Sequence, residues 1–165
     1  MTPGGIFRPG MRGYFVPLAA GLVLSLSAFL PWVVVDGAPH NGYPDTVALW
    51  VVGLGAAAAL LAFLSLLTRR NSRHPLLLVG LVALGIMFLS WRLMPRMAAE
   101  RALTMSQALA IVGTGAEGVT PVTETGFGIF VGLAASTVLV CFGLTIVIRR
   151  PSTAYVIVNP DDDVE

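Results

Sequence analysis

The chain has 165 residues, with ten arginines, no lysine, nine acidic residues, two histidines and one cysteine, which gives a net charge of +1. Hydrophobic residues make up 56% and charged residues 12% of the chain, and the mean hydropathy is +0.83. Soluble domains carry about 25% charged residues, so this composition argues against a soluble globular enzyme and favours the lipid bilayer as the solvent. The low net charge gives no case for a nucleic-acid partner, and one cysteine supplies neither an internal disulfide nor a zinc cluster.

The N-terminal segment, residues 1–13, is rich in glycine and proline, and we expect it to be flexible and cytoplasmic. Residues 14–35 follow as the first predicted transmembrane helix, because they form an uncharged run of the length that crosses a bilayer. A signal peptide is the alternative, since Arg8 and Arg12 precede the run, but the apolar stretch is too long for one. A strand is excluded here, because residues do not alternate and backbone in lipid must bond within a helix or a closed barrel.

The first loop, residues 36–45, is punctuated by glycine and proline, which predicts a tight irregular turn. It carries Asp36, His40 and Asp45, a set that resembles ligands for a divalent metal. No fourth ligand is obvious, so polar turn residues are the interpretation and no metal site is predicted. A lipid-modifying enzyme would require these three residues and Arg92 to converge within hydrogen-bond reach.

The second and third predicted spans cover residues 46–67 and 76–94, and the short loop between them makes the two helices antiparallel neighbours. Arg92 lies within the third span. A cation at mid-bilayer costs about 2.5–3.5 kcal/mol on insertion scales, but near the end of a span its side chain can extend to the lipid phosphates. We therefore interpret Arg92 as an anchor at the outer interface.

The longest loop, residues 95–126, begins with helix-forming residues over 97–112. This pattern predicts a short separate helix on the outer surface, because Pro95 favours a break; direct continuation of the third helix is the alternative. Residues 113–126 are expected to be irregular. Their Gly113–Gly118 stretch matches G-x-G-x-x-G but lacks the strand and helix that a phosphate site needs, so no cofactor is predicted.

The fourth predicted span covers residues 127–148, and an acidic cytoplasmic tail, residues 149–165, follows it. Within the tail, residues 154–158 have an extended pattern. Disorder and addition to the sheet edge of a cytoplasmic partner both remain open for this stretch.

Arginine placement predicts the orientation. Seven arginines fall on the side of the N-terminus and three on the other, so both termini are expected in the cytoplasm. Trp32, Trp50 and Trp91 then all fall at the outer surface, where we interpret them as interface anchors.

Small residues four apart form stripes on three of the spans and allow helix backbones to approach closely. A stripe that no helix of the same chain covers would be a surface for a second copy or a membrane-protein partner. The positions are Gly21 and Ser25 on the first span, Gly53 and Ala57 on the second, with Gly55 and Ala59 beside them, and Gly128, Gly132 and Ser136 on the fourth.

The Leu30-Pro31-Trp32 end of the first span and the Gly126–Phe130 start of the last resemble features of small uncharacterised four-span integral membrane proteins of bacteria. The resemblance covers the layout of the chain and implies no activity.

The sequence thus predicts an all-α membrane protein, an antiparallel four-helix transmembrane bundle over residues 14–148 in the bacterial plasma membrane. Apart from Arg92, the spans hold no ionisable side chain of the kind that pumps and proton-coupled transporters use. We therefore expect a non-enzymatic accessory or scaffold subunit of a larger assembly. The alternative is a small transporter or channel for an uncharged or lipidic solute, which requires Ser27, Ser90, Ser136 and Thr137 to converge on one cavity.

Overall fold

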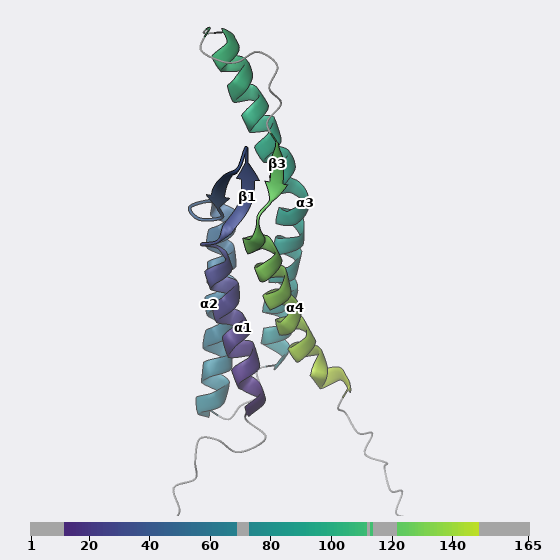
Figure 1. Cartoon of the computed structure of the whole chain (residues 1–165). Helices are drawn as coiled ribbons and strands as arrows, with labels where there is room; N and C mark the ends of the chain where they lie inside the picture. Colours follow the sequence, from purple (N-terminus) through teal and green to yellow (C-terminus); the bar gives the residue numbers. More distant parts are fainter. Residues whose placement is uncertain (1–11, 69–72, 112, 114–121, 149–165) are drawn as a thin grey trace, which may run out of the picture.

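The computed structural model of the chain describes residues 12–68, 73–111, 113 and 122–148. The protein is mostly helical, with a small sheet at one end of the helices (Figure 1). Its elements in chain order are the 3-10 turn η1 (Arg12–Tyr14), α1 (Phe15–Ser27), β1 (Pro31–Val35), β2 (Ala38–Asn41), α2 (Thr46–Thr68), α3 (Arg73–Ile111), β3 (Thr123–Thr125) and α4 (Phe127–Ile148).

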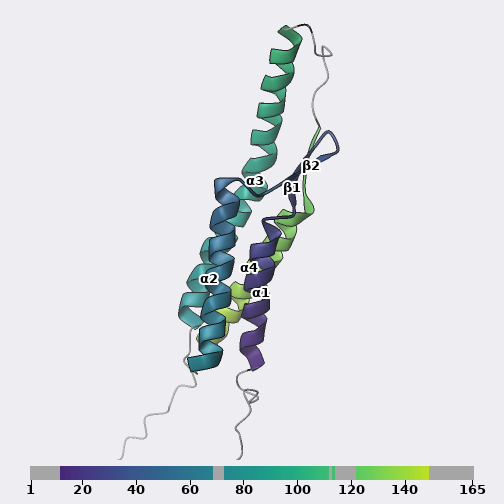
Figure 2. The ribbon, with the colours of Figure 1, turned by 90° about the vertical axis from the view of Figure 1, so that its left-hand side faces the viewer.

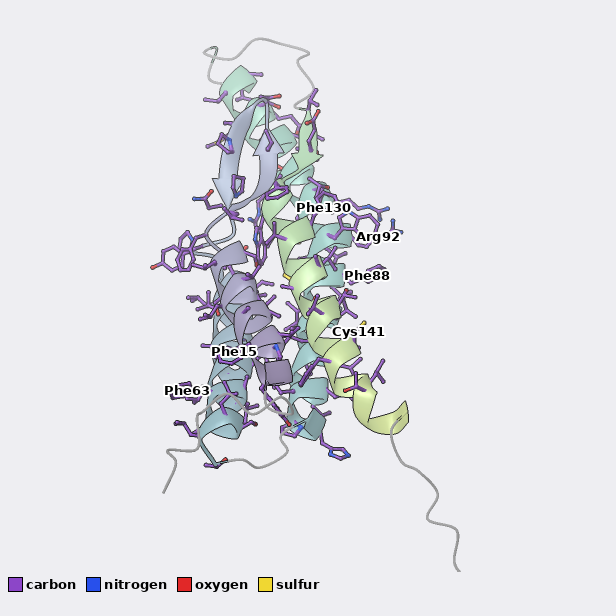
Figure 3. The ribbon with its side chains drawn as sticks, turned by 60° about the horizontal axis from the view of Figure 1, so that its bottom comes forward. Phe15, Phe63, Phe88, Arg92, Phe130 and Cys141 are labelled. Atoms are coloured by element: carbon purple, nitrogen blue, oxygen red, sulfur yellow. The ribbon has the colours of Figure 1, made fainter. Side chains whose placement is uncertain are left out.

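The helices pack side by side, with α1 against α2 and α4, and α3 against α4 and α2 (Figures 1 and 2). Three of them, α2, α3 and α4, are long and apolar enough to cross a membrane, and α1 is a shorter apolar helix. The helix faces turned away from the neighbouring helices carry large apolar side chains, as Phe15 and Phe63 illustrate (Figure 3). Such a surface suits lipid better than water.

The helical prediction for residues 14–35 is wrong at its C-terminal end, because α1 ends at Ser27 and residues 31–35 form β1. Asp36 and Gly37 both have positive φ, 49° and 80°, and Val35 pairs with Ala38 across them. This is a two-residue hairpin turn of the type that Asp-Gly favours after β-branched residues. The predicted irregular turn over 36–45 therefore contains the turn and the second strand of a β-hairpin, and the all-α class is corrected by a small sheet.

The sheet has the strand order β2-β1-β3, with both pairs antiparallel. Residue Asp36 ties β1 to the chain before β3: the Val122 amide donates to its Oδ1 at 2.9 Å, and its own amide donates to the Val122 carbonyl at 2.9 Å. Part of the loop expected to be irregular is thus a strand that pairs with residues about ninety positions earlier.

The expected break at Pro95 is also wrong, because α3 continues through it to Ile111 over 39 residues. A proline inside a helix costs about 3 kcal/mol, since it removes one backbone bond and crowds the preceding turn. Contacts on both sides of the proline offset that cost: Met94 before it and Ala98 after it pack against the core, and β1 and β3 both lie against α3. The residues after Pro95 are also good helix formers.

Small residues set the closest helix contact, between α1 and α2. A Cβ added to Gly21 would lie 2.7 Å from the Ala59 nitrogen and 2.8 Å from the Gly55 carbonyl oxygen. The Ser25 hydroxyl donates to the Val52 carbonyl of α2 at 3.2 Å. The α2 side of this contact is therefore formed by Gly55 and Ala59, whereas Gly53 faces open space and Ala57 is half-buried.

On α4, the three small positions face the interior. A Cβ on Gly132 would meet Met87 of α3 and would lie 2.9 Å from the Ser27 Oγ of α1. Ser136 is fully buried, and a Cβ on Gly128 would lie 2.8 Å from Leu30 Cβ. This stripe accordingly fills the contacts between α4 and its two neighbours.

Candidate functional site

We call the end of the molecule that carries β1, β2 and β3 the sheet end. Trp32 of β1 is its central side chain, with 1% of its surface exposed, and its Nε1 donates to the Ser27 carbonyl at 2.8 Å. Two glycines border the indole: an added Cβ would lie 2.6 Å from Trp32 Cε2 at Gly42 and 2.8 Å from Trp32 Cδ1 at Gly128. Any larger residue at either position would displace the ring.

Trp32 therefore lies inside the protein, and packing accounts for it without an interface role. Trp50 and Trp91 differ, because they are 65% and 36% exposed, and Trp91 lies against Phe88 with ring centroids 5.8 Å apart. Arg92 extends away from the helices (Figure 3). Anchoring of these three side chains at a membrane interface stays a prediction.

The Leu30–Trp32 end of the first predicted span and the Gly126–Phe130 start of the last one meet at this place. The Gly126 amide donates to the Trp32 carbonyl at 2.8 Å. An added Cβ at Gly126 would lie 2.6 Å from the carbonyl carbon of Pro31. The start of α4 is thus fastened to β1 through backbone contacts that only glycine permits.

A cleft of about 810 Å³ lies beside Trp32, between the β1–β2 hairpin, the start of α2 and the face of α3. Figure 2 shows the hairpin and the C-terminal part of α3 diverging from each other. The apolar side chains that line the cleft come from both of its sides. They are Trp32, Val33, Val35, Val47, Ile86, Leu89, Leu93, Met94, Met97, Ala98, Ala102 and Met105.

Few polar side chains line this cleft. His40, Asn41 and Asp45 come from the hairpin side, and Ser90 and Arg101 come from α3. His40 Nδ1 lies 3.0 Å from the Ala38 carbonyl, and the Ser90 hydroxyl donates to the Ile86 carbonyl at 2.8 Å. The cleft is therefore suited to an apolar chain with a polar or charged end.

The polar residues of the first loop do not gather into one site. His40 and Asp45 line the cleft, whereas Asp36 is bonded to Val122 at the hairpin turn and Arg92 lies outside the cleft. Among the described residues there is no group of three or more histidine, cysteine, aspartate or glutamate side chains placed to hold a metal ion. The four residues that a lipid-modifying enzyme would need to bring together, Asp36, His40, Asp45 and Arg92, therefore do not line one site.

The four hydroxyls that a polar path would need do not line one common cavity. Ser90 lines the cleft, but Ser27, Ser136 and Thr137 do not. Ser27 donates to the Leu24 carbonyl at 2.7 Å, and Ser136 and Thr137 donate to the Leu133 carbonyl at 3.0 and 2.8 Å. Each hydroxyl is satisfied on its own helix, as is common in apolar spans.

Comparison of the chain with known protein families, with curated proteins and with solved structures finds no match. Geometry and chemistry therefore carry the functional argument. Sequence reasoning missed the cleft, which depends on the hairpin and on the unbroken α3. The local signal for the hairpin was present in Asp36-Gly37 after three valines.

Proposed function

We propose that this protein is a non-enzymatic accessory or scaffold subunit of a membrane assembly in the bacterial plasma membrane, crossing the bilayer four times. The observation that carries the proposal is the length of α3. Its 39 residues extend over about 58 Å at 1.5 Å per residue, whereas a bilayer core is about 30 Å thick. Roughly half of α3 then projects from the membrane together with the sheet.

Apolar helix surfaces support the four crossings. Leu22, Leu60 and Leu78 are all more than half exposed on α1, α2 and α3. The helix α1 is the shortest, but the apolar run continues on both sides of it from Tyr14 to Leu30. Local thinning of the bilayer accommodates a short span at modest cost.

Arginine placement supports cytoplasmic termini and a sheet end outside the cytoplasm. Arg69 and Arg70 follow α2, and Arg149 and Arg150 follow α4; all four lie outside the described residues, as does the tail stretch 154–158. The test uses single cysteines in a Cys141→Ser background and a membrane-impermeant maleimide applied to intact cells. Labelling is expected for Thr104→Cys on the projecting part of α3 and absent for Ser72→Cys; the reverse pattern contradicts the orientation.

Co-purification tests the accessory role. The tagged chain, extracted in mild detergent, is expected to elute with companion membrane proteins at fixed stoichiometry. Leu103→Arg changes an exposed side chain on the projecting part of α3, and the control Leu67→Arg changes an exposed side chain at the opposite end of the bundle, near the end of α2, where an arginine can reach the lipid phosphates. Loss of the companions is expected for Leu103→Arg in a chain that is still inserted. A clean monomer from the unchanged chain contradicts the proposal.

A second candidate function is passage of a lipidic solute, and the apolar cleft of about 810 Å³ is the observation that favours it. A path for an uncharged polar solute has less support, because of the four hydroxyls only Ser90 lines the cleft. The chain in liposomes with a fluorescent phospholipid distinguishes the two roles. Faster exchange of that lipid between leaflets supports passage, and a rate equal to that of empty liposomes supports the accessory role.

A further inference from the structure

We propose that the cleft at the sheet end binds one phospholipid of the adjacent leaflet, with an acyl chain between β1 and α3 and the phosphate at Arg101. This inference rests on the membrane-spanning part of the proposed function. It does not depend on which side of the membrane the sheet end faces.

The dimensions of the cleft fit one acyl chain. The α3 residues that line the cleft extend from Ile86 to Met105, and the thirteen residues from Leu89 to Arg101 give a rise of about 18 Å at 1.5 Å per residue. One leaflet of a bilayer has an apolar depth of about 15 Å, half of the hydrocarbon core. A lipid whose phosphate lies at Arg101 therefore reaches along the cleft to Leu89, close to the membrane interface where Arg92 is placed, so it is drawn partly out of the leaflet.

The lower part of the cleft opens toward the membrane. Its lining there comes from Val47 at the start of α2 and from Ile86, Leu89 and Leu93 on α3. Leu89 and Leu93 are 56% and 50% exposed, so they face both the cleft and the surrounding lipid. A lipid tail can pass from the bilayer into the cleft along these apolar side chains, beside Ser90, which bonds within α3, and Asp45, which directly precedes α2.

The upper part of the cleft stays apolar where α3 projects beyond the start of α2. Met97 and Met105 are strongly exposed there and face Val35 across the cleft. Apolar surface left in water is unfavourable by about 25 cal/mol per Å², so a bound hydrocarbon chain removes a cost that the free protein carries. Methionine side chains adapt their shape to such a chain.

The position of the positive charge in the cleft determines where the phosphate of the lipid lies. Arg101 is the only arginine among the described residues that line the cleft, and a guanidinium can bind a phosphate through two parallel hydrogen bonds. The carboxylate in the lining, Asp45, lies at the other end of the cleft, directly before the first turn of α2. A phosphate at Arg101 therefore avoids repulsion by Asp45.

Native mass spectrometry of the full chain, purified from phosphatidylcholine and phosphatidylglycerol nanodiscs, tests the proposal. The unchanged chain is expected to retain one phospholipid. Ala102→Trp fills the cleft and is expected to abolish retention, while Ala108→Trp, on an exposed position outside the cleft, keeps it. Arg101→Gln is expected to lower the retained fraction at least threefold, whereas Arg96→Gln, an exposed arginine outside the cleft, leaves it unchanged.

A phospholipid with a diazirine on one acyl chain gives an independent measurement in vesicles. Cross-links are expected at Val47, Leu89 and Leu93 above the level seen at Leu60 on the outer face of α2, and Ala102→Trp is expected to reduce them. Equal labelling of all exposed helix faces, or unchanged lipid retention in Arg101→Gln, overturns the proposal. If the chain is released by an alkaline wash of the vesicles, the membrane-spanning function itself fails, which separates the two results.

Discussion

Two regions of this protein are held together by opposite kinds of contact. Where α1 meets α2, atoms of the backbone come close together, because Gly21 lies against Ala59 and Gly55. At the sheet end, the largest side chain of the core, Trp32, fills the space between Gly42 and Gly128. Helices surrounded by lipid gain little from burying large apolar groups, so close packing of small residues stabilises them. In the proposed membrane arrangement the sheet end lies in water, where burial of an aromatic ring has its full effect.

The largest effect is expected from Trp32→Ala. Removal of a fully buried tryptophan destabilises a core by about 3–5 kcal/mol, and here it also leaves the Ser27 carbonyl without its 2.8 Å donor. Reversible unfolding in mixed micelles, followed by circular dichroism, measures the change. Trp50→Ala is the control, because the Trp50 side chain is exposed and its loss is expected to change stability little. Equal effects for the two variants would contradict the central role of Trp32.

The next effect comes from Gly21→Ala, compared with Gly53→Ala. The added methyl group of Gly21→Ala meets backbone atoms of α2 at 2.7 and 2.8 Å, which cannot move aside as side chains do. Overpacking of this kind costs about 1–3 kcal/mol. The same change at Gly53 faces open space, and it is expected to stabilise α2 by up to about 1 kcal/mol through helix propensity. The same unfolding assay tests the pair, and opposite signs are expected.

A smaller effect is expected from Asp36→Ala, which removes the acceptor of the Val122 amide. One such bond contributes about 1 kcal/mol. Asp36→Asn keeps an acceptor oxygen and tolerates the positive φ of the turn. Hydrogen exchange at the Val122 amide is therefore expected to accelerate in Asp36→Ala and to stay slow in Asp36→Asn. Equal protection in both variants would show that the side chain does not fasten β3.

The smallest effect is expected from Ser136→Ala. The hydroxyl donates to the Leu133 carbonyl of its own helix at 3.0 Å, so its removal leaves no group on another helix unpaired. The expected loss is below about 0.6 kcal/mol, the average for side-chain hydrogen bonds between membrane helices. The unfolding assay detects a larger loss, which would indicate that Ser136 serves a contact between helices.

Hydropathy predicts where α2 and α4 begin, because their apolar runs start directly after polar loops at Thr46 and Phe127. It fails at Val33–Val35, which count as apolar in any window although they are β-branched and precede Asp-Gly. A hydropathy window cannot separate a buried strand from a span when both are apolar. Local turn chemistry could have separated them.

The continuation of α3 through Pro95 could not be predicted from local propensity alone, because contacts of α3 with β1 and β3 add to its stability. The cleft is less predictable still. It joins residues of the hairpin to residues of α3 that lie about sixty positions later, and no pattern along the chain reports such a pairing. His40 lies near Asp36 in the sequence, but in the fold it shares the cleft with Arg101.

The central place of β1 in the sheet has a consequence for biosynthesis. β2 follows β1 after two residues, but β3 follows only after α2 and α3 have been made. While the ribosome produces these helices, one edge of β1 has no partner strand. The hydrogen bond from the Gly126 amide to the Trp32 carbonyl cannot yet form. The sheet is therefore completed only when the segment before α4 has left the ribosome, and a chain cut short before Thr123 would carry an open strand edge.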